Sequence, residues 1–211
     1  MPSPKITDRD IRVVHSVYKY KYLSASQIQR LHFPSETTRN RRLRRITDEG
    51  LIESFQILNI AERIFRLATG GAQLVASRLG VEPDDLLWTR SLKKPKDYYF
   101  MRHLIRLNDV RIALEKATHD GPVEMRGFIP EYYGKKERSG TVSKYVRDMT
   151  FDITSPHEEL PHTPDAVFCL EKNSRPALFF LEVDRGTETL SNPQKGVLKM
   201  IRFYLSYLAQ G

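Results

Sequence analysis

Apolar residues near the start of the chain recur every three or four positions, which is the spacing of one helix face. Ile11, Val14 and Val17 follow Thr7, a residue type that commonly caps the start of a helix. A second, short helix follows and ends before Pro34, because the residue that precedes a proline avoids helical backbone. The pattern therefore predicts two consecutive helices in this part of the chain.

The pattern continues with a third helix and then changes its period. Ser35 is a suitable cap for this helix, and Gly50 suits the left-handed residue that often ends one. Beyond Gly50, residues 51–58 and 63–67 predict two strands joined by a turn, and a further helix follows at 72–79. Three helices, a two-stranded hairpin and a closing helix are typical of a winged helix-turn-helix domain.

The second half of the chain mixes helical and strand patterns and predicts an α/β domain. We expect a helix from Tyr98, strands at 123–129, 149–153, 166–170 and 177–184, and a last helix at 193–208. Residues 134–146 are rich in Gly, Lys and Ser and predict a loop. The run at 177–181 is so apolar that we expect a strand buried on both faces.

These patterns divide the chain into three segments. Residues 1–80 form the winged helix, residues 81–97 form a linker with two prolines and mixed charge, and residues 98–211 form the α/β domain. The fold class that we expect is therefore α+β, with an N-terminal winged helix followed by a separate α/β domain.

Positive charge is concentrated at the start of the chain. The formal net charge is +8, and residues 1–50 carry 11 Lys or Arg against 5 Asp or Glu. Residues 51–95 carry 6 against 5, and residues 96–211 carry 17 against 16. A local basic segment beside a nearly neutral remainder favours a nucleic-acid-binding module attached to another domain over an ordinary basic surface.

The third predicted helix contains five arginines within residues 39–45. Leu43 and Ile46 share one face and should pack inward, which leaves the basic face for a partner. Arginine binds guanine or phosphate, so we predict double-stranded DNA as that partner. The candidates on this helix are Thr37, Thr38, Arg41, Arg42, Arg44 and Arg45. Secondary candidates for phosphate contacts are Lys19, Lys21 and either Arg63 or Arg66 on the hairpin.

Acidic residues occur at the ends of two consecutive predicted strands. Asp165 begins one strand, and Glu182 and Asp184 end the next. If the two strands pair across their short turn, Asp165 and Glu182 lie close together. Two carboxylates can hold Mg²⁺ or Mn²⁺, which would activate water for phosphodiester hydrolysis. The alternative is that these acids are solvated at the strand ends or paired with Arg175 or Arg185.

This spacing resembles the core of the PD-(D/E)xK nuclease superfamily. The resemblance implies that Asp165 and Glu182 bind metal and that a lysine orients the attacking water. Asp184 stands where the superfamily has that lysine, so Lys195 or Lys199 on the next helix is the candidate substitute. The strand expected after that helix is missing, so either the sequence stops inside the fold or this version is reduced. The candidate catalytic residues are Asp165, Glu182, Asp184 and Lys195.

The whole chain is similar to the replication-relaxation family. The matching residues are the segment 7–31, Arg41 to Arg45 with Gly50 to Ile52, Arg102-His103, Asn108 to Val110, Pro164 to Ala166, Leu181 to Glu188, Lys195 and Tyr204. The resemblance implies a winged helix joined to a degenerate nuclease-like domain in proteins of plasmids and integrated mobile elements. The family name implies a role in plasmid replication or DNA relaxation.

Three functions remain open. The first is a double-stranded DNA-binding protein in the replication, transfer or regulation of a plasmid or other mobile element, with a homodimer and replication or transfer proteins as expected partners. The second is a Mg²⁺- or Mn²⁺-dependent endonuclease targeted by the winged helix. The third is an interaction module whose basic helix binds an acidic partner. Neither a metal nor another cofactor follows with certainty from the sequence.

The sequence gives no sign of membrane insertion or secretion. No apolar run approaches the roughly 20 residues of a membrane span, and no apolar segment follows the N-terminus as in a secretory signal. The single cysteine, Cys169, suits a reducing compartment. We therefore expect a cytoplasmic protein without a membrane partner.

Overall fold

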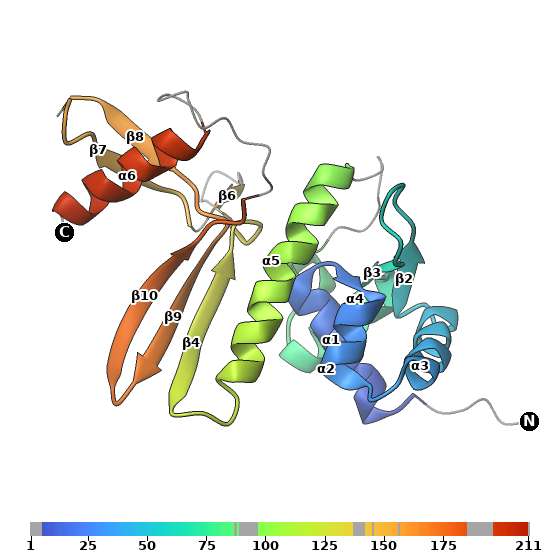
Figure 1. The fold of residues 1–211 in the computed structure, drawn as a ribbon. Helices are drawn as coiled ribbons and strands as arrows, with labels where there is room; N and C mark the ends of the chain where they lie inside the picture. Colours follow the sequence, from blue (N-terminus) through green and yellow to red (C-terminus); the bar gives the residue numbers. More distant parts are fainter. Residues whose placement is uncertain are drawn as a thin grey trace, which may run out of the picture. The chain divides into compact units, whose positions relative to one another are not determined.

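The computed structural model describes residues 6–86, 88, 97–136, 142–144, 146–155, 157–184 and 196–210. The chain separates into two compact units, the first ending at Ala113 and the second beginning at Leu114. Each unit has its own sheet and its own packed helices (Figure 1).

The first unit is a winged helix, as the sequence predicted. It contains α1 (Asp8–Tyr20), β1 (Leu23–Ser24), α2 (Ala25–His32), α3 (Glu36–Asp48), β2 (Ile52–Phe55), β3 (Ile64–Leu67), α4 (Thr69–Leu79), the short 3₁₀ helix η1 (Pro83–Asp85) and the first part of α5 (Tyr98–Ala117). The three strands form an antiparallel sheet in the order β1-β3-β2. The consecutive helices α2 and α3 make the helix-turn-helix, and the β2–β3 hairpin (residues 52–67) is the wing.

Local capping fixes where the first three helices begin. Thr7 and Asp10 form a reciprocal capping box at α1, and Ser24 and Gln27 form another at α2. The hydroxyl of Ser35 accepts a hydrogen bond from the backbone of the third residue of α3. The helix starts therefore follow from residues that are close in sequence.

The apolar faces of these helices form one core together with apolar residues of the sheet. Its fully buried members include Val13, Val14, Val17, Ile28, Ile46 and Ile52. Leu86 is buried in the same core and Trp88 packs against it, with its indole nitrogen 3.2 Å from the carbonyl of Pro83. The start of the segment expected as a linker therefore packs on the winged helix, and residues 89–96 lie outside the described part of the chain.

The first part of α5 also belongs to this unit, although the sequence suggested that a second domain would begin at Tyr98. The side-chain amide of buried Asn108 donates to the carbonyls of Tyr20 and Tyr22, at 3.2 and 2.7 Å. The guanidinium of Arg111 lies 4.8 Å from the centre of the Tyr20 ring and donates to the carbonyl of Lys19. These polar side chains satisfy carbonyls at the end of α1 and just after it, which ties α5 to the winged helix.

A buried ion pair joins α1 to α3. The Asp10 carboxylate is fully buried and accepts hydrogen bonds from Arg42 Nε at 2.8 Å, from Arg42 Nη2 and from the backbone and hydroxyl of Thr7, both at 2.7 Å. Burial by itself would raise the pKa of Asp10, but the hydrogen bonds from Arg42 and Thr7 outweigh it and lower that pKa. The carboxylate is therefore ionised and compensated at neutral pH.

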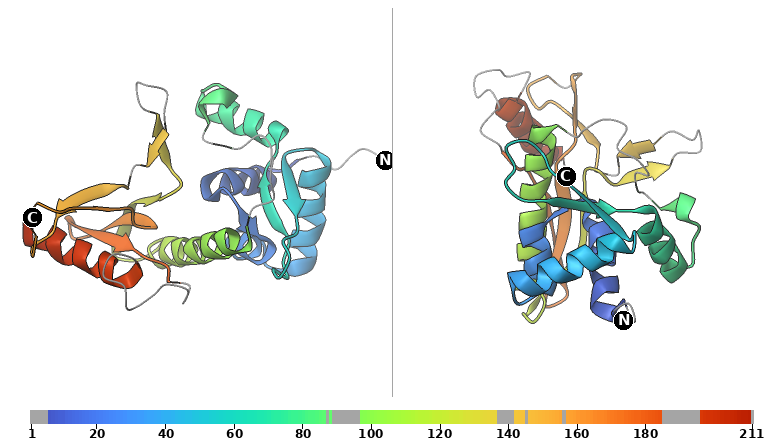
Figure 2. Two further views of the ribbon diagram at one scale, coloured as in Figure 1. Left: turned by 90° about the horizontal axis from the view of Figure 1, so that it is seen from above. Right: turned by 90° about the vertical axis from the view of Figure 1, so that its right-hand side faces the viewer.

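The second unit combines an antiparallel sheet with a helix and two short hairpins. It contains the end of α5, β4 (Val123–Pro130), β5 (Gly134–Lys136), β6 (Val142–Lys144), β7 (Asp148–Phe151), β8 (Glu159–His162), β9 (Ala166–Lys172), β10 (Arg175–Leu181) and α6 (Gly196–Gln210). The main sheet has the order β10-β9-β4, while β5 pairs with β6 and β7 with β8. Helix α6 packs on the β7–β8 hairpin (Figure 2).

Two expectations for this unit differ from the structure. The segment predicted as a loop at 134–146 carries the β5–β6 pair. The apolar strand expected to be buried on both faces is the edge strand β10, where the exposed fractions of Leu178 and Phe179 are 60% and 41%. Only β9 pairs with it among the described strands, so one edge and much of its surface stay open.

The described helices include none that is long and apolar enough to cross a bilayer.

The Asp10–Arg42 pair predicts a large loss of stability on neutralising the acid. Asp10→Asn leaves Arg42 without its buried counter-charge, and we expect the free energy of unfolding to fall by about 2–4 kcal/mol. Asp8→Asn removes an exposed acid from the same helical turn and should cost less than about 1 kcal/mol. Urea unfolding followed by circular dichroism at neutral pH measures both variants.

The same pair also predicts acid sensitivity. Because the pKa of Asp10 in the folded protein is below its ordinary value of 3.8, its stabilisation is complete above that value and is lost as the pH falls through the folded pKa. Urea unfolding of Asp10→Asn should accordingly depend less on pH in the acid range than that of the unmodified protein. Equal acid profiles for the two proteins would contradict the role given to this carboxylate.

Candidate functional site

Helix α3 presents two arginines to solvent and keeps its apolar face inward. Leu43 and Ile46 are buried against the rest of the first unit, as predicted. Arg41 and Arg44 are exposed, and neither makes an ion pair with any residue that the structure describes. These two guanidinium groups are therefore free to bind an external anion.

The other arginines of α3 are engaged within the protein. Arg42, expected to contact DNA, donates to Asp10 and its side chain is only 17% exposed. Arg45, also expected there, pairs with Glu49 one turn further along the helix, and its Nε atom is buried. Arg39 is buried as well and donates to Glu36 Oε1 at 2.7 Å. The basic run thus divides into side chains that hold α3 in place and side chains that face outward.

An open groove lies between α3 and the wing, with a volume of about 930 Å³. We call it the α3 groove; side chains that line it include Gln29, Asn40, Arg44, Thr47, Ser54 and Arg63. Of the two wing candidates, Arg63 is exposed, whereas Arg66 is buried and pairs with Glu53 at 2.7 Å. The wing therefore contributes Arg63, and not Arg66, to the exposed basic surface.

The remaining candidates of the first unit have mixed positions. Thr37 is exposed at the start of α3, and Thr38 accepts a hydrogen bond from Ser35 at 3.0 Å. Lys19 is exposed with its ammonium 5.5 Å from the centre of its neighbour's aromatic ring, and Lys21 is half-buried just after α1. Neither lysine is among the described residues that line the α3 groove.

The acidic candidates of the second unit lie at one end of the main sheet. Strands β9 and β10 pair with Ala166 opposite Leu181, which brings the residues just outside them, Asp165 and Glu182, to the same end. Asp165 Oδ2 accepts a hydrogen bond from the backbone nitrogen of Val183 at 2.6 Å. The strand pairing on which the sequence argument depended is therefore present.

Glu182 is engaged by side chains that the sequence analysis did not assign to the site. Its Oε1 atom accepts a hydrogen bond from the hydroxyl of Tyr204 on α6 and lies near Nε2 of His162 on β8, both at 2.6 Å. Burial raises the pKa of Tyr204, and the neighbouring Glu182 raises it further. Tyr204 is therefore a neutral hydrogen-bond donor, and Glu182 connects β8, the end of β10 and α6.

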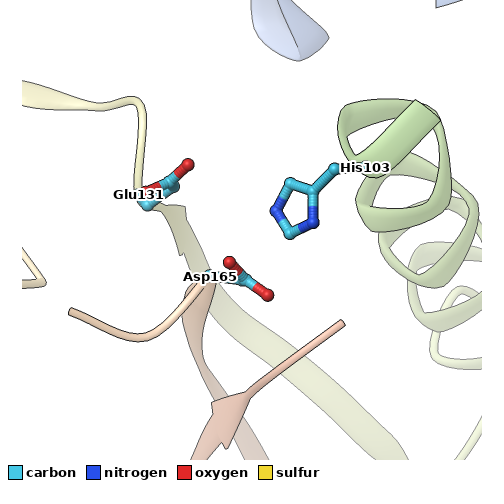
Figure 3. Close-up of side chains that lie close together, drawn as sticks. All are labelled: His103, Glu131 and Asp165. Atoms are coloured by element: carbon cyan, nitrogen blue, oxygen red, sulfur yellow. The ribbon is translucent and has the colours of Figure 1, made fainter. Parts of the chain in front are cut away.

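Glu131 is an acid that the sequence analysis missed. It directly follows β4, and its backbone nitrogen donates to the carbonyl of Asp165 at 2.8 Å. Carboxylate oxygens of Glu131 and Asp165 lie within 4.8 Å of each other (Figure 3). Its position at the end of a strand was the available signal, but only the pairing of β4 with β9 brings it to Asp165.

The last two candidates do not join this pair. Asp184 is exposed beyond the end of β10. Lys195, one candidate for the missing lysine, lies outside the described residues. In the described part of the second unit, the acidic pair therefore consists of Glu131 and Asp165.

Comparison with solved structures finds proteins of low similarity. A cysteine-to-serine mutant of MarR from E. coli, in complex with operator DNA, is 16% identical with a TM-score of 0.33, over 54% of this chain and 76% of that chain. A mutant of MepR from a multidrug-resistant S. aureus isolate is 16% identical with a TM-score of 0.35, over 52% and 80%. NadR in complex with 4-hydroxyphenylacetate is 16% identical with a TM-score of 0.34, over 55% and 73%. Scores this low carry no conclusion about this chain.

Comparison with sequences gives a clearer result. No curated protein sequence matches significantly. The family model described as replication-relaxation, in contrast, matches residues 14–211, which include most of both units. The chain therefore belongs to the replication-relaxation family.

Proposed function

We propose that this protein binds double-stranded DNA through its winged helix and acts in the replication, transfer or regulation of a plasmid or other mobile element. The observation that carries the proposal is the exposure of Arg41 and Arg44 on the outer face of α3, without ion pairs to described residues. Membership of the replication-relaxation family supports a DNA-binding role. A homodimer and replication or transfer partners remain predictions.

The geometry of the first unit suits recognition through the major groove. In a helix-turn-helix the second helix enters that groove, and its N-terminal part contacts the bases. On α3 this part carries Thr37 and Arg41, and Arg44 follows one turn later. A planar guanidinium can form two hydrogen bonds with guanine or bind a phosphate oxygen. Arg63 lines the other side of the α3 groove, and in this proposal it contacts the DNA backbone.

Internal contacts of two other α3 arginines contribute to this recognition indirectly. Arg42 joins α3 to α1 through its ion pair with Asp10. Arg39 joins α3 to α2 by donating a hydrogen bond to Gln29 Oε1 at 2.7 Å. Side chains held in this way fix the helix on which Arg41 stands. A recognition helix with a fixed position loses less conformational entropy when it binds DNA.

Removal of either exposed arginine should weaken DNA binding. A duplex is first selected from a randomised pool by the unmodified protein, and its affinity is measured by fluorescence anisotropy in EDTA. We expect Arg41→Ala and Arg44→Ala each to lower the affinity by about 5- to 150-fold, the range for loss of one good base contact. Arg78→Ala removes an exposed arginine of α4 and should leave the affinity nearly unchanged.

Two results would overturn the proposal. One is failure of the unmodified protein to bind any duplex at low salt, which would favour an acidic protein as the partner of α3. The other is an equal effect of Arg41→Ala and the Arg78→Ala control. Circular dichroism of each variant shows whether the fold is retained.

A second candidate function is metal-dependent DNA cleavage by the second unit. The observation in its favour is the closeness of the Glu131 and Asp165 carboxylates. Oxygen ligands from two carboxylates fit Mg²⁺ or Mn²⁺, and such an ion would activate water and stabilise the leaving oxygen. Glu182, which the sequence analysis also assigned to the metal, accepts a hydrogen bond from Tyr204 through one carboxylate oxygen and remains a candidate ligand in this mechanism.

This candidate predicts nicking of supercoiled plasmid that needs Mn²⁺ and stops in EDTA. Asp165→Asn and Glu131→Gln should abolish it without weakening the binding of short duplexes. Asp148→Asn, which removes an exposed acid from β7, is the matched control and should cleave normally. Binding without any metal-dependent nicking would leave DNA binding as the function and reject cleavage.

A further inference from the structure

The N-terminal half of α5 is fastened to the helix-turn-helix by polar contacts. The side-chain amide of Gln27 donates to the carbonyl of Ile105 at 2.8 Å and to Asp109 Oδ1 at 2.9 Å. Arg30 of α2 forms an ion pair with the same Asp109 carboxylate. The face of α5 next to these residues therefore keeps a defined position relative to α2 and the wing.

Two arginines of this helix border a pocket beside the wing. Arg102 and Arg106 are exposed and one turn apart, and neither forms an ion pair with a described residue. The pocket has a volume of about 300 Å³, and Ser24, Ser26 and Asn59 also line it. Guanidinium, hydroxyl and amide groups are the side-chain donors that bind phosphate oxygens of DNA.

Both acids that line the same pocket accept hydrogen bonds, and one of them, Asp109, also has a counter-charge. Asp109 accepts from Gln27 and pairs with Arg30. Glu62 accepts a hydrogen bond from the backbone nitrogen of Ser26 at 2.8 Å. Among the described residues, the pocket therefore carries two unpaired arginines against one carboxylate without an ion pair, Glu62.

The pocket adjoins the α3 groove. Ser26, Ala61 and Glu62 line both, so the two hollows meet where the start of α2 lies beside the loop between β2 and β3. The α3 groove contributes Arg44 and Arg63 from one side, and the pocket contributes the two α5 arginines from the other. A nucleic-acid backbone that leaves the α3 groove past the wing would meet this second basic pair.

We infer that Arg102 and Arg106 form a second phosphate-binding patch, which extends the DNA contact of the winged helix beyond α3 and the wing. Side chains one helical turn apart have Cβ atoms about 5–6 Å from each other, so two long arginines can reach neighbouring phosphates of one strand. The inference rests on the proposed DNA binding and adds a contact on a helix that the sequence assigned to another domain.

Phosphate contacts have a signature that differs from base contacts. They add affinity for every sequence and make binding depend more steeply on salt, because each releases counterions from the duplex. The double variant Arg102→Ala/Arg106→Ala should therefore weaken binding to a selected and to a scrambled duplex by similar factors. The slope of log affinity against log salt should fall by about 0.9 for each lost contact.

Matched variants separate this role from a general charge effect. Arg78→Ala/Lys116→Ala removes two exposed cations elsewhere and should retain the full salt slope. Arg102→Lys/Arg106→Lys keeps both charges and should restore most of the slope lost in the alanine variant. Fluorescence anisotropy at several salt concentrations, with both duplexes and every variant in EDTA, measures these effects.

The outcomes distinguish this inference from the proposed function. If the Arg102→Ala/Arg106→Ala variant keeps the full slope while Arg41→Ala loses affinity, the patch is rejected and DNA binding through α3 stands. An equal loss in the Arg78→Ala/Lys116→Ala control would also reject the patch. If the unmodified protein binds neither duplex, the proposed function fails first.

Discussion

The position of α3 depends on one buried carboxylate. Asp10 completes the capping box of α1 and accepts the guanidinium of Arg42, so the same group starts one helix and anchors another. Burying an ionised carboxylate destabilises a protein unless the charge is paired. If Arg42 turned toward a ligand, Asp10 would be left buried without its counter-charge, so Arg42 stays inside. The neighbouring Arg41 and Arg44 face outward because Arg42 is held inward.

Local signals explain why most of the first unit could be predicted from the sequence. Thr7 and Ser35 act on backbone groups three residues away, and the apolar spacing of α1 and α3 identifies the faces that pack. The end of the unit could not be predicted in this way. It depends on Asn108, whose hydrogen bonds go to carbonyls at the end of α1 and just after it, far away in the sequence. No local pattern records such a contact.

In the candidate site of the second unit, too, the sequence predicted what local strand order fixes and missed what tertiary packing adds. Asp165 and Glu182 flank two strands joined by a tight turn, so their common end of the sheet followed from the sequence. Glu131 reaches Asp165 only through the pairing of β4 with β9, and Tyr204 reaches Glu182 only through the packing of α6. Acids were identifiable by residue type, but their hydrogen-bond partners required the tertiary structure.

The number of charged residues in a segment therefore says less about its binding partner than the number of those residues that lack an ion pair within the protein. Five arginines made α3 the obvious DNA-binding element, yet Arg39, Arg42 and Arg45 pair with acids of the same unit. The nearly neutral remainder of the chain hid Arg102 and Arg106, because its acids balance its bases in number. At this pocket, however, Asp109 pairs with Arg30 and leaves both α5 arginines without an ion pair to a described residue. The basic surface offered to a nucleic acid is consequently smaller on α3, and wider across the unit, than the distribution of charge along the sequence indicates.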